Sequence, residues 1–256
     1  MQAIWSVTAL VFGLVVGSFL NVCIYRLPRS ESIVYPGSRC PTCETPLKWY
    51  HNIPVLSFIA LRGRCAFCGA PISLAYPLVE LCMGVLSLAL FVKYGPSLTF
   101  AAFFLFVAAL LAVAFIDLRT RIIPDVISLP GIAVGLLFSL IRDDITVWAS
   151  IIGLLAGGGS LFLVSWGYYL LTKREGMGMG DVKLMAMIGA FLGWQAVIFV
   201  ILSSSLIGAV TGTFLMFRKG EDSKFAIPFG PFLSLGALLY LFQGPALVDW
   251  YLNMFR

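Results

Sequence analysis

Two aspartates stand at the ends of long apolar runs in this chain. Asp117 closes the run 98–116, and Asp181 precedes the run 182–192. A charged side chain inside hydrocarbon costs at least about 2.5 to 3.5 kcal/mol, so acids at membrane depth mark a candidate functional site. Asp181 also suits a structural role, because aspartate is a favoured cap for a helix that begins at Val182.

The two carboxylates predict a specific chemistry if they meet in space. Two carboxylates within about 3 to 5 Å cannot both ionise readily, so one keeps a proton while the other polarises a water between them. One group then acts as general base on a water that attacks a carbonyl, and the other donates a proton to the carbonyl oxygen. We therefore interpret Asp117 and Asp181 as the catalytic pair of an aspartic protease.

The apolar run after Asp181 is short. Its 11 residues rise only about 16 Å as a helix, which would draw Asp181 below the inner membrane surface. Gly176, Gly178 and Gly180 favour irregular backbone, which is tolerated at that depth only where protein or a wet cavity covers it. We expect Gly178 and Gly180 to form a supporting loop that lines the catalytic cavity.

Four cysteines form two Cys-x2-Cys pairs, Cys40 with Cys43 and Cys65 with Cys68, separated by 21 residues. This spacing is slightly wider than that of the usual zinc ribbon. Two thiolates three residues apart in a tight turn can share one tetrahedral ion, and Gly69 eases the second turn. The pattern predicts one structural zinc ion. Disulfides are the alternative, and catalytic zinc is disfavoured because four thiolates leave no open position.

Four other residues could bear chemistry. Glu80 is an acid inside the apolar run 74–92, where it could orient the amine of a substrate or pair with an arginine. His51 is the only histidine and lies beside the cysteine pairs, where we interpret it as a local hydrogen-bonding or surface residue. Cys23 and Cys82 lie in apolar runs and are interpreted as packing residues.

The composition places these residues in a membrane. The chain has 256 residues, of which 60% are hydrophobic and 11% charged, whereas soluble domains are about one-quarter charged. We predict an all-α polytopic membrane protein with about eight transmembrane helices and a small cytoplasmic zinc module between the first two. The apolar segments are 3–24, 74–92, 98–116, 122–141, 147–171, 182–192, 196–217 and 228–250.

The basic residues set the expected orientation. Placing 25–73 in the cytoplasm puts 14 of the 17 basic residues inside, as the positive-inside rule expects. Both termini then face outward, and the zinc module and aspartates face the cytoplasm. The net charge of +5 is accounted for by this asymmetry, so nucleic acid is not an expected partner. The three residues left outside are Lys93, Arg142 and Arg256.

The domain boundaries follow from this pattern. We predict a first transmembrane helix over 1–24, retained in the mature protein, a cytoplasmic zinc module over 25–73 and a seven-helix membrane domain over 74–256. A module of about 49 residues can hardly build a sufficient hydrophobic core, so we expect a bound metal to stabilise it. Within the membrane domain, the run Gly157-Gly158-Gly159-Ser160 should allow close helix approach.

These motifs together resemble the bacterial type IV prepilin peptidases. The resemblance is carried by Gly178-Met179-Gly180-Asp181, by the stretch from Phe115 to Asp125, by Gly17-Ser18-Phe19-Leu20-Asn21-Val22 and by the cysteine pairs, and it covers nearly the whole chain. Gly-x-Gly-Asp alone also occurs in the wider class of intramembrane aspartyl proteases. In the family, the first aspartate of Asp-x7-Asp and that of Gly-x-Gly-Asp are catalytic, which implies Asp117 and Asp181. Asp125 is then interpreted as a helix cap.

The resemblance also implies substrates, a cofactor and a location. It implies cleavage, on the cytoplasmic side of the inner membrane, of the short basic leader of prepilins or type II secretion pseudopilins. Members commonly also methylate the new N-terminus with S-adenosylmethionine. No Gly-x-Gly-x-x-Gly follows a strand in the polar module, so a methyl-donor site would be unconventional and near the zinc module or the membrane surface.

Two other readings stay open. A protease without methyltransferase activity would need only the two aspartates, although the four cysteines favour the bifunctional reading. A proton-coupled transporter would also use buried carboxylates. It should show matching interrupted helices in two related halves, and the chain has no convincing internal repeat.

Overall fold

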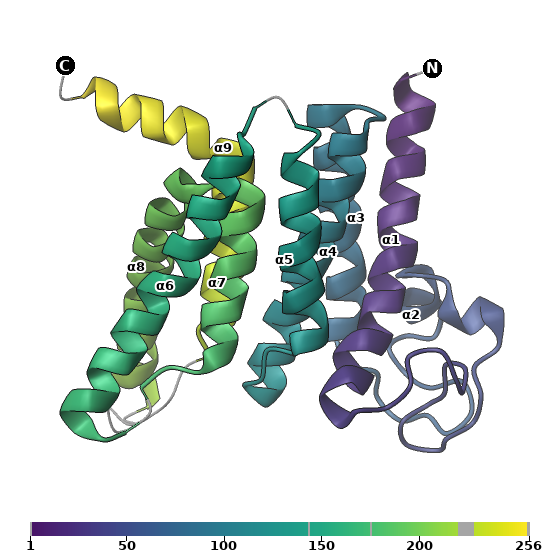
Figure 1. Cartoon of the computed structure of the whole chain (residues 1–256). Coiled ribbons are helices and arrows are strands. Elements are labelled where there is room, and N and C mark those ends of the chain that lie inside the picture. Colours follow the sequence, from purple (N-terminus) through teal and green to yellow (C-terminus); the bar gives the residue numbers. More distant parts are fainter. Residues whose placement is uncertain (1, 143, 175, 220–227, 255–256) are drawn as a thin grey trace. The chain divides into compact units, whose positions relative to one another are not determined.

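The computed structural model describes residues 2–142, 144–174, 176–219 and 228–254 (Figure 1). Within these ranges the regular structure is helical, with isolated bridges in place of strands. The α-helices are α1 (Gln2–Arg26), α2 (Leu56–Ala60), α3 (Ala75–Tyr94), α4 (Leu98–Thr120), α5 (Asp125–Ser139), α6 (Val147–Thr172), α7 (Met179–Leu192), α8 (Trp194–Lys219) and α9 (Gly230–Asn253). Two 3-10 turns, η1 (Leu27–Arg29) and η2 (Trp49–Asn52), lie before α2.

The all-helical polytopic class is confirmed, because each predicted apolar segment coincides with a helix. In the described residues, five helices are long and apolar enough to cross a membrane: Ala3–Arg29, Ala75–Tyr94, Leu98–Thr120, Val147–Thr172 and Trp194–Phe217. The apolar parts of α5 and α9, Asp125–Ser139 and Gly230–Gly244, are shorter, and α7 has 14 residues. A 14-residue helix rises only about 21 Å, so the count of eight spans stays a prediction.

The chain divides into two compact units, Met1–Ala112 and Val113–Arg256, with the boundary inside α4. The first unit contains α1, the polar segment with the four cysteines, α2, α3 and the first part of α4. The second contains the end of α4 and helices α5 to α9. Both aspartates belong to the second unit, whereas the cysteines and Glu80 belong to the first.

Helices α1 and α3 pack closely in the first unit because glycines remove side chains between them. A Cβ atom on Gly17 would lie 2.7 Å from the Cα atom of Glu80, and one on Gly13 would also collide with α3. One turn after Gly17, the Asn21 side chain donates a hydrogen bond to the Tyr76 carbonyl at 3.1 Å. This contact explains why Gly17 and Asn21 occur in one motif on α1.

Helices α6 and α7 approach equally closely in the second unit. A Cβ atom on Gly157 would lie 2.6 Å from the Met185 carbonyl oxygen, and Gly153 faces Gly189 with their backbones in contact. The predicted role of the glycine run is confirmed at Gly157 and is absent at Gly159, where a Cβ atom would have no neighbour within 4 Å. Small residues thus fix α7, the helix that carries Asp181, against α6.

Candidate active site and metal centre

Asp117 lies on α4 with its side chain buried, at 5% exposed. Its Oδ2 atom accepts a hydrogen bond from the backbone N–H of Gly230 at 2.9 Å. Gly230 is the first residue of α9, so the carboxylate lies at a helix N-terminus, where unpaired N–H groups and the helix dipole favour negative charge. A Cβ atom at position 230 would be 2.8 Å from Oδ2. Gly230 therefore permits this approach.

Asp181 lies inside the first turn of α7 rather than before it. Gly178 is the N-cap residue of α7 and has extended backbone, and the N–H of Asp181 donates to the Gly178 carbonyl at 3.2 Å. The alternative role of Asp181 as a side-chain cap is wrong, because α7 starts at Met179 and has no side-chain cap bond. Its Oδ1 atom is buried and has no hydrogen-bond partner among the described residues. An unpaired buried oxygen is costly, so it needs an explanation from function.

Asp117 and Asp181 border one site within the second unit, because Ile123 packs against a glycine beside each of them. Ile123, which is buried, lies between the glycines beside them. A Cβ atom on Gly180 would be 2.9 Å from the Ile123 Cβ, and one on Gly230 would be 3.2 Å from its Cδ1. Sequence reasoning found the two acids and missed Ile123 and Gly230. Of these, only Gly230 had a local signal, since it stands between Phe229 and Pro231 where a helix could begin.

The glycine-rich segment before Asp181 is partly as predicted. Gly176 and Gly178 lie outside helical structure, whereas Gly180 belongs to α7. The Ser165 hydroxyl on α6 donates a hydrogen bond to the Met177 carbonyl at 3.2 Å, which holds the segment against α6. The predicted irregular loop therefore ends one turn before Asp181.

Asp125 is not a helix cap. Pro124 is the N-cap residue of α5 and Asp125 is its first helical residue, with both carboxylate oxygens accepting from the Lys183 ammonium at 2.7 Å. This ion pair joins α5 to α7. Because both side chains are partly exposed, it stabilises the fold by no more than about 1 kcal/mol. The sequence pattern of a cap and that of a first-turn acid are the same, which explains the wrong prediction.

The four cysteines come together as predicted. Their sulfur atoms all lie within 4.8 Å of one another, and the sulfurs of Cys40 and Cys68 are 3.9 Å apart. Sulfurs bound at about 2.3 Å around a tetrahedral zinc ion are separated by roughly 3.8 Å. The donor set of Cys40, Cys43, Cys65 and Cys68 therefore fits a structural zinc ion.

Each cysteine pair lies in a small turn of the same design. The N–H of Glu44 donates to the Cys40 carbonyl at 2.9 Å, and that of Gly69 donates to the Cys65 carbonyl at 3.0 Å. Both residues have left-handed backbone, with φ of 54° at Glu44 and 71° at Gly69. The predicted turn at Gly69 is confirmed, and Glu44 takes the same conformation without the freedom of glycine.

The environment of Cys43 favours the thiolate that a metal requires. Hydrogen bonds from the side chain and backbone of Thr45 lower the pKa of the Cys43 thiol to about 6. His51 is outside the cysteine cluster, with its ring edge-on to those of Tyr50 and Phe67. Its backbone N–H donates a local hydrogen bond to the Lys48 carbonyl at 2.9 Å, whereas its Nδ1 atom is buried and has no partner among the described residues.

Glu80 forms no ion pair with an arginine among the described residues of the first unit. It is buried, and its Oε2 atom accepts a hydrogen bond from the Val55 N–H at 2.8 Å. Ser18 on α1 also donates to this carboxylate. The Glu80 carboxylate therefore accepts hydrogen bonds from a backbone N–H and a hydroxyl group instead of pairing with an arginine.

Comparison with known proteins identifies the family of this chain. Residues 11–94 match the Bacterial Peptidase A24 N-terminal domain, and residues 103–213 match the Type IV leader peptidase family. Relatives named Prepilin leader peptidase/N-methyltransferase occur in Aeromonas hydrophila, at 40% identity over 98% of this chain and 96% of the relative, and in Stutzerimonas stutzeri, at 39% over 97% and 94%. The chain belongs to this prepilin leader peptidase/N-methyltransferase family. No solved structure matches it.

Proposed function

We propose that this protein removes the leader of type IV prepilins or type II secretion pseudopilins and then methylates the new N-terminus. Family membership supports both activities. The observation that carries the peptidase assignment is the shared buried site of Asp117 and Asp181, with a backbone donor on the first acid and an unpaired oxygen on the second.

The two carboxylates take different roles because their surroundings differ. Asp117 receives the Gly230 N–H at a helix N-terminus, which favours its ionised form as the general base. Asp181 Oδ1 has no donor among the described residues, which favours the carboxyl that carries the shared proton. Because the two carboxyl groups are coupled, their titration is a property of the pair and not of either residue alone.

The cleavage step then follows the order expected of a carboxylate pair. Asp117 takes a proton from water, whose oxygen attacks the scissile carbonyl carbon, while Asp181 gives its proton to the carbonyl oxygen. When the intermediate collapses, the carbon–nitrogen bond breaks, the amine leaves with the proton held by Asp117, and a hydroxyl proton of the intermediate returns to Asp181 as the new carboxyl group forms. For the second activity, S-adenosylmethionine supplies a methyl group that the new α-amine accepts as it loses a proton, leaving S-adenosylhomocysteine.

The four cysteines would hold one zinc ion with a structural role. Their spacing in space fits tetrahedral thiolate coordination, and four thiolates leave no position for substrate. The zinc ion would stabilise a segment that has little regular structure besides η2 and α2. Disulfides are disfavoured in the cytoplasm, the compartment where we place this segment.

We further propose a multi-pass inner-membrane protein with both termini outward and with the zinc module and aspartates toward the cytoplasm. The distribution of basic residues supports this orientation. Lipid is then a partner along the exposed apolar helix faces. Family membership leaves no place for the transporter reading, and the N-terminal domain match and the relatives' names favour the bifunctional enzyme over a peptidase alone.

The test uses purified protein in lipid with a synthetic prepilin and S-adenosylmethionine, and it reads the product by mass. Asp117→Asn and Asp181→Asn should each reduce leader removal by at least about 1,000-fold, because neither variant retains both acid and base functions. Asp144→Asn, a change of an exposed acid in the same unit, should cleave like the wild type. Near-normal cleavage by either dyad variant would remove that residue from the mechanism.

A further inference from the structure

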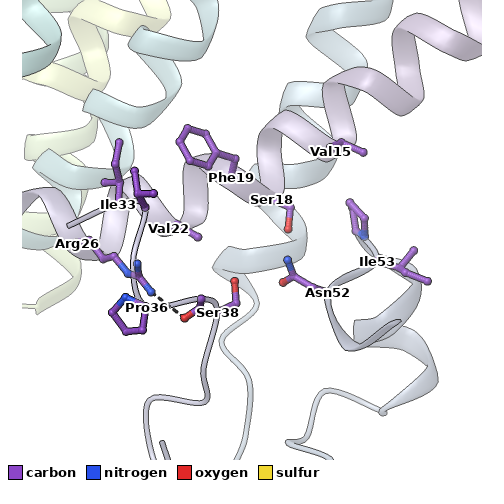
Figure 2. Close-up of a pocket in the computed structure, with 13 residues that line it drawn as sticks. Val15, Ser18, Phe19, Val22, Arg26, Ile33, Pro36, Ser38, Asn52 and Ile53 are labelled. Carbon is purple, nitrogen blue, oxygen red and sulfur yellow. Dashed lines mark hydrogen bonds between the residues drawn. The ribbon is translucent and has the colours of Figure 1, made fainter. Parts of the chain in front are cut away.

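A cavity of about 530 Å³ opens in the first unit between α1 and the polar segment that follows it (Figure 2). Residues of α1 form one wall, and residues 33–38 and 52–54 form the others. Such a volume is within the range of small-molecule sites. The cavity contains neither aspartate and none of the four cysteines, so the peptidase and zinc assignments leave it unexplained.

Arg26 is the charged residue among those that line the cavity, and its surroundings are unusual for a buried cation. It is 7% exposed and donates hydrogen bonds to the Ser32 carbonyl at 2.9 Å and to the Gly37 carbonyl at 3.1 Å (Figure 2 draws the second). Within the part of the chain that the structure describes, no carboxylate pairs with it. A buried charge without a counter-ion is costly, and a guanidinium retains further N–H donors for an anion.

The backbone directly after the wall residues 52–54 is strained. Val55 has φ of 60° and ψ of −47°, and the N–H of Leu56 donates to the Pro54 carbonyl at 2.6 Å, which makes a γ-turn centred on Val55. This form of γ-turn is rare, and a β-branched residue at positive φ is an outlier. The Glu80 carboxylate holds the turn by accepting the Val55 N–H. Residues with strained backbone cluster at active sites and ligand clamps.

The shape and chemistry of this cavity suit one ligand class. Its apolar residues, such as Val15, Val22 and Ile53, can cover a base and a sugar, while the Ser18 hydroxyl and the Asn52 amide offer polar contacts. Arg26 offers a buried cation for a carboxylate. A nucleoside linked to an amino acid has these parts.

We propose that this cavity binds the methyl donor, S-adenosylmethionine, with its carboxylate on Arg26, and that Glu80 is a positioning residue, which holds the turn at Val55 next to the wall residues 52–54. The proposal rests on the methyltransferase part of the proposed function. The chain's own residues would hold the donor without a Gly-x-Gly-x-x-Gly motif, because Arg26 replaces the backbone donors of such a loop in binding the anionic end. All residues that line the cavity belong to the first unit, so donor binding can be tested separately from the aspartate pair.

The test measures binding by calorimetry on the full chain in lipid nanodiscs. Two probes are used: S-adenosylhomocysteine, which keeps the amino-acid part, and 5′-methylthioadenosine, which lacks it. Arg26→Gln should weaken S-adenosylhomocysteine by roughly 10- to 100-fold, the range expected for a charge-assisted hydrogen bond, and should leave methylthioadenosine within about twofold. Equal weakening of both probes would mean that Arg26 only supports the fold and would overturn the carboxylate assignment.

A second pair of variants tests whether the probes bind in the cavity while Arg26 is left unchanged. Val22→Trp places a large side chain in the cavity and should abolish binding of both probes, whereas Val11→Trp, at an exposed position on the same helix, should not. Glu80→Ala should weaken both probes, and Glu80→Gln should restore most of the affinity because an amide oxygen can accept the Val55 N–H. Normal affinity in Val22→Trp would place the donor elsewhere.

The same preparations separate this proposal from the peptidase assignment. Asp181→Asn should bind S-adenosylhomocysteine like the wild type while cleaving no prepilin. Arg26→Gln should still remove the leader and lose methylation at a limiting donor concentration. If no probe binds the wild type and leader removal is intact, the cavity proposal fails and the peptidase stands.

Discussion

At the scale of single residues, the two aspartates differ in one respect that the sequence does not show. Asp117 has a backbone donor at the start of α9, and Asp181 has a buried oxygen with no partner among the described residues. A symmetric dyad would have matching donors on both sides. The asymmetry supplies a physical basis for assigning base and acid within the pair.

Glu44 and Gly69 follow the two cysteine pairs, and substitutions at these positions should change stability in opposite directions. Glu44→Gly should stabilise the zinc module by about 1 kcal/mol, because glycine takes the left-handed backbone without a steric penalty. Gly69→Ala should destabilise it by about the same amount through backbone strain alone, since no atom lies within 4 Å of the added Cβ. The midpoint of thermal unfolding measures both changes.

Glu44→Ala is the matched control for that experiment. It removes the charge and the 3.9 Å contact with Arg39 while keeping a Cβ atom at positive φ. Because that ion pair is exposed, its loss should change stability little. A stabilisation in Glu44→Ala equal to that in Glu44→Gly would show that the charge, and not the backbone, is responsible.

At the scale of elements, the contact between α6 and α7 depends on the absence of side chains. Gly157→Val should destabilise the protein by roughly 1 to 3 kcal/mol, because the new Cβ would lie 2.6 Å from the Met185 carbonyl. Gly159→Val, two residues along the same helix, meets no atom within 4 Å and should be nearly neutral. Thermal unfolding in detergent compares the two. Equal effects would mean that glycine acts through helix propensity alone.

The helices also show which features of the fold and site could be predicted from the sequence. The acids, the cysteines and the helix segments were predictable because residue type, spacing and hydrophobic runs are local signals. Ile123 and Gly230 were not, since their roles come from contacts between helices far apart in sequence. The start of α7 was placed three residues late, because glycines at 178 and 180 read as loop although the second is helical. Asp125 was misassigned because its partner Lys183 lies 58 residues away.

At the scale of the whole molecule, zinc removal should act on the first unit and spare the second. Cys40→Ser with Cys43→Ser should lower bound zinc from one ion per chain to nearly none and lower the unfolding temperature, because binding energy of a structural zinc is folding energy. Zinc should also dissociate as pH falls, since the thiolates become protonated. Metal analysis and thermal unfolding measure these effects. Unchanged zinc in the double variant would contradict the four-cysteine site.

The direct backbone contact between Gly153 and Gly189 fixes how far α7 can travel along its axis. A screw movement of one residue, which combines a rise of about 1.5 Å with a rotation of about 100°, would bring Ile188 or Ala190 opposite Gly153, where no Cβ atom fits. Asp181 is therefore held at one depth by a steric stop two turns away from it.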